Sequence, residues 1–383
     1  VDDAGIAQGA ISDGDIRRYL LKSNNNGLAS QCTDVMNVDF KSHNKSSNLK
    51  KLKNSYVNGI DCIPILDNLG RIIELSFDDL KGFKIGNKDI SDKSSSYIIA
   101  EIGNNHQGEI NLAKKLVDFA IDAGADCAKF QMRDMSTLYV ESVNTESSDL
   151  GSEYTLDLLS KFQLTNDELF EVFDYCYKKN ITPLCTPWDL TSLKALELYG
   201  MEAYKIASAD YTNYELLDAV CETGKPFICS TGMSTEKEII STSQYLDTKG
   251  ANFILLHCNS TYPTPFRDVN LNYLNRIRKL TKKLVGYSGH ERGISVPIAA
   301  VALGAAVIEK HITTNKELLG TDHKVSLLPD EFKQMVSQIR DVEDSLSLGN
   351  NPREISQGEM INRETLAKSL VANQDISKGI KIS

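Results

Sequence analysis

The sequence predicts an α/β protein whose largest part is a closed (β/α)8 TIM barrel. Eight short apolar runs with strand character alternate with amphipathic helical segments between residues 97 and 311. Short buried strands separated by helices are typical of parallel βα units, and eight units in about 215 residues approach the ~250 residues of an ordinary barrel. The alternative is an open doubly wound sheet, but the first turn reads EIGNNHQG and lacks the GxGxxG pattern.

The strands are predicted from runs rich in apolar and β-branched residues. They cover residues 97–101, 127–131, 181–187, 203–208, 226–232, 253–258, 284–290 and 306–311. Apolar residues recur at helical spacing over 110–123, and Gly124 supplies a stop signal. Thr165 and Glu168 have the spacing of a capping box, so a further helix is predicted to begin there.

Two polar stretches divide the chain of 383 residues. Residues 85–96 are rich in Ser, Lys and Asp and are predicted to be a linker between a front segment, 1–84, and the barrel, 97–347. Residues 348–383 begin with a turn-rich stretch and form a tail. The first residue is Val and the front segment opens as if inside a domain, so we expect an N-terminal piece to be missing.

The net charge and the hydropathy of the chain exclude some classes of binding partner. The net charge of −10 argues against nucleic acid. No apolar run approaches the ~18–20 residues of a membrane span, so no membrane partner is expected. The eight cysteines form no CxxC pair and are expected to be buried reduced thiols. We therefore expect a cytoplasmic protein that acts on small molecules.

Polar side chains lie at the C-terminal end of every predicted strand. In chain order they are Glu101, Lys129, Gln131, Thr186, Lys205, Ser208, Ser230, His257, Ser288, His290, Glu309 and His311. The carboxyl ends of barrel strands meet at one mouth, where barrel enzymes carry their active sites. Because side chains alternate along a strand, Glu309 and His311 face the mouth together. Lys310 points the other way, toward the helical layer or the rim, and receives no chemical role.

These groups predict a metal site beside an anion site. His290 and His311 on adjacent strands are candidate metal ligands that leave positions for substrate oxygens and water, although each alone reads as a structural histidine. For His257 the sequence favours neither interpretation, a metal ligand or a structural histidine. The anion site is expected to consist of Lys129, Thr186, Lys205, Ser208, Ser230 and Ser288. With Glu101 placed to activate water, the chemistry indicated is carbon–carbon bond formation between an activated phosphoester and a carbonyl compound.

Seven motifs in this order resemble the bacterial sialic acid (nonulosonic acid) synthases. They are IIAEIGNNHQG, AKFQ, KIAS, STGM, HCNSTYPTP, GYSGH and EKHIT, and the resemblance covers residues 97–383. It implies a transferase that condenses phosphoenolpyruvate with an open-chain N-acyl hexose, adds water and releases phosphate. The hexose would be N-acetylmannosamine or a 2,4-diacetamido-trideoxyhexose. A divalent metal is implied, Mn²⁺ with Mg²⁺ or Co²⁺ as alternatives, and so is a homodimer.

The resemblance also implies roles for individual residues. Glu101, His290 and His311 would be catalytic, and the two histidines would bind the metal. The pocket for phosphoenolpyruvate would consist of Lys129, Thr186, Lys205, Ser208, Ser230 and Ser288. The sugar would contact Gln131, Ser260, Tyr262, Glu309 and Asp322. Ser260 stands where the sialic acid synthases carry a sugar-contacting Asn, which leaves the identity of the sugar open.

The two flanks resemble further modules. Residues 1–84 resemble a CBS module that lacks its first strands, and Ser12, Asp15, Ser76 and Asp79 have the spacing used there to bind an adenine nucleotide. The alternative is a spacer or dimerisation unit. The tail resembles only the start of the antifreeze-like (SAF) domain of the sialic acid synthases, so most of that domain is expected to be missing.

Two other functions stay open on the sequence. One is a barrel aldolase in which Lys205 or Lys129 forms a Schiff base with the substrate. The other is a CBS-type nucleotide-sensing regulatory or scaffold protein with a degenerate barrel. The intact pair of histidines, pair of lysines and Glu101 argue against a degenerate site.

Overall fold

Eight parallel strands close into the predicted barrel in a computed structural model that describes residues 1–2, 4–12, 15–16, 19, 30–44, 62–77, 83–138, 158–346 and 352–381. The barrel strands are β6 (Tyr97–Glu101), β7 (Cys127–Met132), β8 (Thr182–Pro187), β9 (Tyr204–Ile206), β10 (Phe227–Ser230), β11 (Phe253–Cys258), β12 (Val285–Gly289) and β13 (Val307–His311). Their closed order is β10-β11-β12-β13-β6-β7-β8-β9. All eight predicted strands are confirmed, with each end within two residues of its predicted place.

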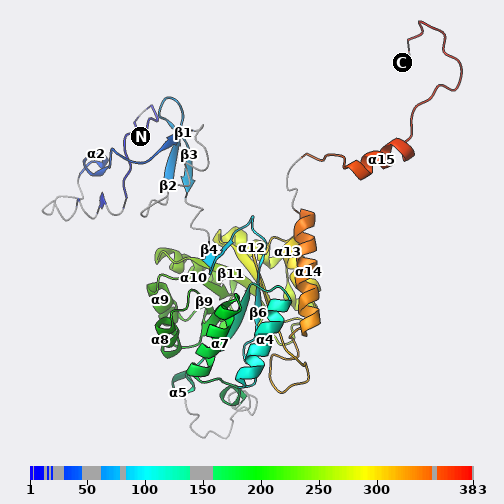
Figure 1. The fold of residues 1–383 in the computed structure, drawn as a ribbon. Helices are drawn as coiled ribbons and strands as arrows, with labels where there is room; N and C mark the ends of the chain where they lie inside the picture. Colours follow the sequence, from blue (N-terminus) through cyan, green and yellow to red (C-terminus); the bar gives the residue numbers. More distant parts are fainter. Residues whose placement is uncertain are drawn as a thin grey trace.

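Helices cover the outside of this barrel (Figure 1). In chain order they are α4 (Ile110–Asp122), α5 (Met135–Leu138), α7 (Asn166–Lys178), α8 (Leu190–Tyr199), the 3-10 turn η2 (Ser208–Asp210), α9 (Tyr214–Glu222), α10 (Glu236–Thr248), α11 (Phe266–Val269), α12 (Tyr273–Thr281), α13 (Ser295–Ala302) and α14 (Pro329–Leu346). The strand–helix alternation is therefore the one expected of a (β/α)8 fold.

Local sequence signals set several helix ends. The Thr165 hydroxyl accepts a hydrogen bond from the Glu168 backbone N–H, and the Glu168 carboxylate accepts one from the Thr165 N–H, which confirms the predicted capping box of α7. The same reciprocal pair, Thr235 and Glu238, begins α10. Helix α8 ends at Gly200, whose φ of 92° lies in the left-handed region that favours glycine.

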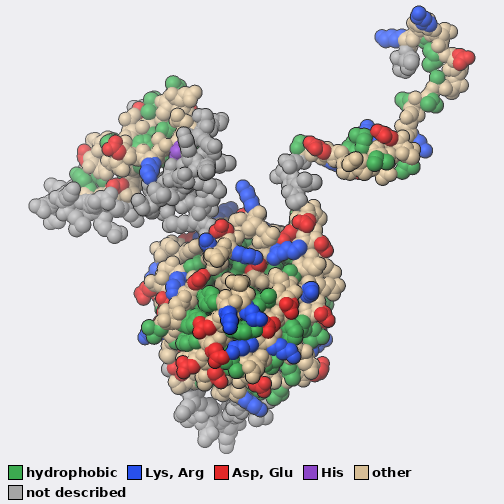
Figure 2. All heavy atoms as spheres, in the orientation of Figure 1, with side chains coloured by type: hydrophobic (Ala, Val, Ile, Leu, Met, Phe, Trp, Pro, Cys, Tyr) green, Lys and Arg blue, Asp and Glu red, His purple; other side chains and the backbone are tan. Residues whose placement is uncertain are grey.

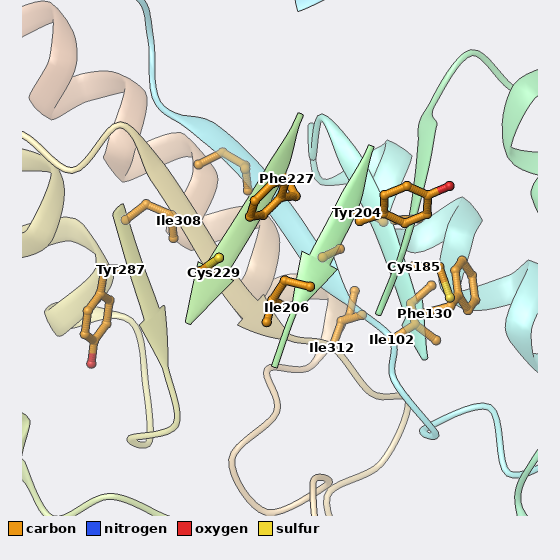
Figure 3. Close-up of a cluster of buried hydrophobic side chains, with 14 of the residues drawn as sticks. Ile102, Phe130, Cys185, Tyr204, Ile206, Phe227, Cys229, Tyr287, Ile308 and Ile312 are labelled. Carbon is orange, nitrogen blue, oxygen red and sulfur yellow. The ribbon is translucent and has the colours of Figure 1, made fainter. Parts of the chain in front are cut away.

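Side chains alternate between the inside of the barrel and the helical layer. One buried cluster fills the inside, with Ile99, Cys127, Leu184, Ala203, Ile228, Leu256 and Val307. The intervening residues pack against the helices, and Figure 3 shows part of that outer cluster, including Tyr204, Ile206, Cys229 and Ile308. Two residues after the inner cluster, the inward positions become polar: Glu101, Lys129, Thr186, Lys205, Ser230 and Glu309. The strand period thus places polar side chains above an apolar plug.

Residues 85–96, expected to be a linker, contain part of a β-hairpin. Strands β4 (Phe83–Ile85) and β5 (Lys88–Ile90) pair antiparallel around a turn in which Gly86 has a φ of 57°. Phe83, Ile85 and Ile90 are buried in the same cluster as the barrel interior. The polar composition of this segment concealed the hairpin, because only three apolar side chains are needed to anchor it.

The flanking segments add small elements. The front segment contains α2 (Cys32–Val35) and a sheet of β1 (His43–Asn44), β2 (Cys62–Leu66) and β3 (Ile72–Phe77), in which β1 pairs parallel and β3 antiparallel with β2. The tail contains α15 (Gln357–Leu366), none of whose residues is buried. On the barrel face seen in Figure 2, acidic and basic side chains are interspersed. Among the described helices, none combines the length and the hydropathy of a membrane span.

Candidate active site

A cavity of about 590 Å³ opens at the C-terminal ends of the barrel strands, a volume within the ~300–1,000 Å³ range of small-molecule sites. It brings together every side chain that the sequence assigned to metal, anion and sugar. These are Glu101, Lys129, Gln131, Thr186, Lys205, Ser208, Ser230, Ser260, Tyr262, Ser288, His290, Glu309, His311 and Asp322. For the residues on the strands the convergence follows from the parallel strands and their side-chain period, whereas Ser260, Tyr262 and Asp322 come from loops after β11 and β13. The role of each residue stays a prediction.

Two lysines and two glutamates form a buried charge cluster at the base of this cavity. The Nζ of Lys129 lies 2.7 Å from Oε2 of Glu101, and the Nζ of Lys205 lies 3.2 Å from Oε1 of Glu309. Lys129 also lies 3.7 Å from Oε2 of Glu309, so the two pairs are linked. All four side chains are 5% exposed or less, which makes each charge dependent on its neighbours.

Hydroxyl groups extend the charge cluster. The Lys129 amine donates to Oγ1 of Thr186 at 3.3 Å, and the Lys205 amine donates to Oγ of Ser230 at 2.7 Å. The Ser288 hydroxyl donates to Oε1 of Glu309 at 3.0 Å. Glu309, predicted as a sugar contact, therefore lies within the lysine cluster. A mixed set of ammonium and hydroxyl donors can bind the oxygens of a phosphate or carboxylate.

The two buried carboxyl groups differ in proton affinity. Burial raises the pKa of Glu101, with a further rise from the nearby Glu309, and the ion pair with Lys129 only partly offsets it. Burial acts on Glu309 too, but Lys129 and Lys205 outweigh it and lower the pKa of Glu309 to about 2. Two carboxyl groups with separated pKa values suit different tasks, one in proton transfer and one as a permanent anion.

The imidazoles of His290 and His311 lie beside this cluster with ring centroids 5.4 Å apart. Nδ1 of His290 lies 2.7 Å from the carbonyl oxygen of Asn259, which can only accept, so Nδ1 carries a proton and Nε2 is the ring nitrogen directed into the cavity. The Tyr262 hydroxyl donates to Nε2 at 2.9 Å. Backbone control of one ring nitrogen is the arrangement that orients a metal-binding histidine.

His311 presents an unsatisfied nitrogen. Its Nδ1 is buried without a hydrogen-bond partner, and the nearest acidic atom is Oδ2 of Asp322 at 3.7 Å. Burial lowers the pKa of His311 to about 3, so its imidazole is neutral, as a metal ligand must be. No three His, Cys, Asp or Glu side chains cluster as a metal site anywhere in the described ranges. The imidazoles of His290 and His311 are donors of a kind that divalent cations bind, and two of them would leave other positions to water and substrate.

Comparison with known proteins settles the family. The pattern that defines the NeuB family matches residues 116–351. An N,N'-diacetyllegionaminic acid synthase of Campylobacter jejuni is 40% identical over 289 residues, covering 74% of this chain and 86% of that protein. The chain belongs to the NeuB family.

Two further relatives support the assignment. The N-acetylneuraminate-9-phosphate synthase of Homo sapiens is 34% identical over 288 residues, covering 74% of this chain and 79% of that protein. The crystal structure of an N-acetylneuraminic acid synthetase of Leptospira borgpetersenii, in complex with citrate, superposes with a TM-score of 0.67 at 33% identity, covering 75% of this chain and 98% of that chain. The predicted resemblance to sialic acid synthases is thereby confirmed, and so is the barrel fold.

One wall of this NeuB-family cavity was not predicted from the sequence. The Arg133 guanidinium lies 4.2 Å from the ring centroid of Trp188 and donates to Oε1 of Gln131. The Gln131 amide in turn donates to Oε1 of Glu101 at 2.6 Å. Arg133 lies two residues after Gln131, and strand parity would have placed both on the mouth side. Cys258 lines the cavity for the same reason.

Two of the polar residues at strand ends face the helical layer. His257, left open by the sequence, packs between Tyr273 and Tyr287 and its Nε2 lies 2.8 Å from the Val269 carbonyl oxygen, so it is a structural residue. Lys310 points away from the mouth as predicted, yet it is fully buried and does not lie at the rim. Burial lowers the pKa of Lys310 despite its contact with a carboxylate.

The nucleotide site predicted in the front segment is described only in part. Ser12 donates from both its N–H and its hydroxyl to Oδ2 of Asp15, at 2.9 and 2.6 Å. Asp79 lies outside the described residues. Ser76 lies in β3 opposite Ile63, and nothing is described of its side chain. Binding of an adenine nucleotide by this segment stays a prediction.

Proposed function

We propose that this chain is a nonulosonic (sialic) acid synthase. It condenses phosphoenolpyruvate with an open-chain N-acyl hexose, either N-acetylmannosamine or a 2,4-diacetamido-trideoxyhexose, adds water and releases phosphate. The observation that carries the proposal is one cavity, in a NeuB-family barrel, that joins a buried lysine–hydroxyl cluster to a pair of oriented imidazoles. The first suits the anionic substrate and the second suits the sugar aldehyde.

The lysine cluster is assigned to phosphoenolpyruvate. In this structure the charges of Lys129 and Lys205 are balanced by Glu101 and Glu309. A substrate with a phosphate and a carboxylate adds negative charge, so its oxygens take over donors that now bind carboxylates or hydroxyls. The hydroxyls of Ser208, Ser230, Ser288 and Thr186 complete the set of donors.

Glu101 is assigned to the attacking water. The C2–C3 π electrons of phosphoenolpyruvate form a bond from C3 to the aldehyde carbon, and water adds at C2 as one of its protons passes to the Glu101 carboxylate. Glu101 returns that proton to the new sugar alkoxide. The bond between C2 and the bridging oxygen then breaks as the C2 hydroxyl becomes a carbonyl, and phosphate leaves with both bonding electrons and the hydroxyl proton. The raised pKa of Glu101 matches a group that must accept and return a proton.

The imidazole pair is assigned to a divalent cation, for which we propose Mn²⁺. His290 would bind through Nε2, since its Nδ1 proton is held by the Asn259 carbonyl, and His311 would use the unsatisfied Nδ1. When bound, such a cation polarises a carbonyl oxygen as a Lewis acid. Tyr262 holds Nε2 of His290 through its hydroxyl and would move to the sugar.

The alternative of a Schiff-base aldolase is disfavoured by the charge cluster. A nucleophilic lysine needs a lowered pKa. Burial acts on Lys129 in that direction, but Glu101 and Glu309 outweigh it and raise its pKa. Lys205 is held by Glu309 and Ser230, with its amine donating to both. Borohydride is therefore expected to trap no substrate on either lysine.

The experiment that tests the proposal measures phosphate release from phosphoenolpyruvate with a panel of sugars. N-acetylmannosamine, its 6-phosphate and a 2,4-diacetamido-trideoxyhexose are each tested with Mn²⁺ and with a chelator. The proposal expects release with at least one of them, and loss of release in the chelator. Release that needs no sugar, or absence of release with every sugar, contradicts it. Because Ser260 replaces an expected Asn, the ranking of the sugars reads out the specificity of this chain.

A further inference from the structure

A buried ion pair lies directly behind the imidazole pair. The Nζ of Lys310 donates to Oε1 of Glu291 at 2.9 Å and also to the backbone carbonyl of Glu291. Both side chains are 0% exposed. The hydroxyl of Tyr287, a residue of the outer buried cluster in Figure 3, donates to Oε2 of Glu291 at 2.5 Å. None of the three lines the cavity.

The backbone is shaped to admit this carboxylate. A Cβ atom added to Gly289 would lie 2.8 and 2.9 Å from the two carboxylate oxygens of Glu291, and 2.9 Å from Cε1 of Tyr287. A side chain at position 289 would therefore displace the Glu291 carboxylate or the Tyr287 ring from the places they occupy, and glycine leaves that space to them. The GYSGHE segment therefore holds the carboxylate in a fitted position.

Each end of the ion pair is bonded to a predicted metal ligand along the chain. Glu291 follows His290, and Lys310 precedes His311. The strands pair here in parallel register, with Gly289 opposite Lys310. A third contact, from the Thr264 N–H to the His290 carbonyl at 3.0 Å, fixes the same turn. The ion pair thus joins the two backbone segments whose side chains carry the imidazoles.

Stability alone does not account for a charged pair in this place. Removing two charges from water costs several kcal/mol per ion, and an apolar pair of similar volume often stabilises a core as well or better. The neighbouring outward positions are filled by apolar side chains such as Ile308 and Ile312. An apolar pair cannot supply the hydrogen bond that Lys310 donates to the backbone carbonyl of Glu291, the residue after His290.

We propose that Lys310, Glu291 and Tyr287 are positioning residues that set the separation and orientation of the His290 and His311 imidazoles. Through that geometry they control the affinity of the site for a divalent cation. The second statement rests on the metal assignment of the proposed function, whereas the first concerns the protein without metal. Loss of outer partners of metal ligands weakens binding by about 10–100-fold in other sites.

The test uses the full chain and Mn²⁺ alone as probe, with binding followed by calorimetry and by the electron paramagnetic resonance of free Mn²⁺. Lys310→Met is expected to weaken Mn²⁺ binding about 10–100-fold. The matched control is Lys225→Met, which removes a lysine paired with Glu197 outside the cavity and is expected to leave binding unchanged. A wild-type affinity in Lys310→Met overturns the inference.

A double variant, Lys310→Met with Glu291→Leu, separates positioning from stability. The apolar pair is expected to restore the thermal midpoint toward that of the wild-type protein while Mn²⁺ binding stays weak. Recovery of both, without the hydrogen bond to the carbonyl, would mean that the pair serves only the fold and would overturn the inference.

A metal-free measurement keeps this inference distinct from the proposed function. The ¹H–¹⁵N spectrum of the histidine rings should show the Nδ1 proton of His290 in the wild-type protein, and Lys310→Met should shift or remove this signal while the ring nitrogen signals of His106, whose Nδ1 accepts from the Gly108 N–H, are unaltered. If the wild-type chain binds no Mn²⁺, the metal assignment fails, yet the ring spectra still decide the positioning claim. Unchanged His290 signals in Lys310→Met would refute it.

Discussion

Substitution of Lys205 by Met tests the assignment of the anion site most sharply. In this structure the Lys205 amine bonds Ser230 at 2.7 Å and Glu309 at 3.2 Å, and it is 4% exposed. A hydrogen bond to a charged group contributes about 1.5–3 kcal/mol. Loss of one such bond to phosphoenolpyruvate should raise its KM about 10–150-fold, since ~1.4 kcal/mol is a factor of ten.

The same change has a predictable effect on stability. Breaking a buried ion pair costs about 3–5 kcal/mol. Glu309 keeps Ser288 at 3.0 Å and Lys129 at 3.7 Å, so we expect a loss at the lower end, about 3 kcal/mol. Steady-state kinetics with varied phosphoenolpyruvate and urea unfolding measure the two effects. An unchanged KM in a folded Lys205→Met protein refutes the anion assignment, and Lys225→Met serves as the control with neither effect.

Three further predictions address the metal, the pocket and pH. His311→Ala should abolish Mn²⁺-dependent phosphate release, and release that persists in chelator would contradict this. Gly232→Ala should raise the KM for phosphoenolpyruvate with little change in thermal midpoint. The new Cβ would lie 2.3 Å from Oγ of Ser260 and 2.7 Å from Oγ of Ser208, so both of these cavity hydroxyls must leave their present positions. An unchanged KM would place the substrate elsewhere. Burial lowers the pKa of His106 to about 4, so the unfolded chain takes up a proton below its ordinary value of 6.5 while the fold does not. His106 should therefore contribute a loss of about 2 kcal/mol to the free energy of unfolding between pH 7 and pH 5, and His106→Asn should lack this contribution in urea unfolding measured at both pH values.

Much of the barrel could be predicted because its signals are local. Eight apolar runs predict the strands, and the alternation of side chains along a strand predicts which of them face inward. These two signals place the lysines, the serines, Glu309 and both histidines at one mouth without knowledge of their contacts. The same reasoning would have found Cys258 and Arg133, which lie on the same parity. Neither a cysteine nor an arginine by itself indicates a role at such a position.

Features that depend on contacts between residues far apart in the chain could not be predicted from the sequence. Strand parity correctly predicted that Lys310 points away from the mouth. Its burial depends on the ion pair with Glu291, which lies nineteen positions earlier in the chain, in the turn after another strand. The hairpin of β4 and β5 depends on apolar contacts with the barrel interior. The Ser/Lys/Asp-rich composition of the segment gives no indication of these contacts. Strand parity gives the direction of a side chain and leaves its partner undetermined.

In the proposed synthase reaction, phosphoenolpyruvate reacts with a sugar by cleavage of the bond between C2 and the bridging oxygen. The reaction is run in ¹⁸O-labelled water, and the released phosphate is analysed by mass spectrometry. We expect phosphate without ¹⁸O, formed only when an N-acyl hexose is present. Phosphate that carries ¹⁸O from the solvent would mean attack at phosphorus, and phosphate formed without sugar would mean hydrolysis of phosphoenolpyruvate alone. Either result would contradict the synthase assignment.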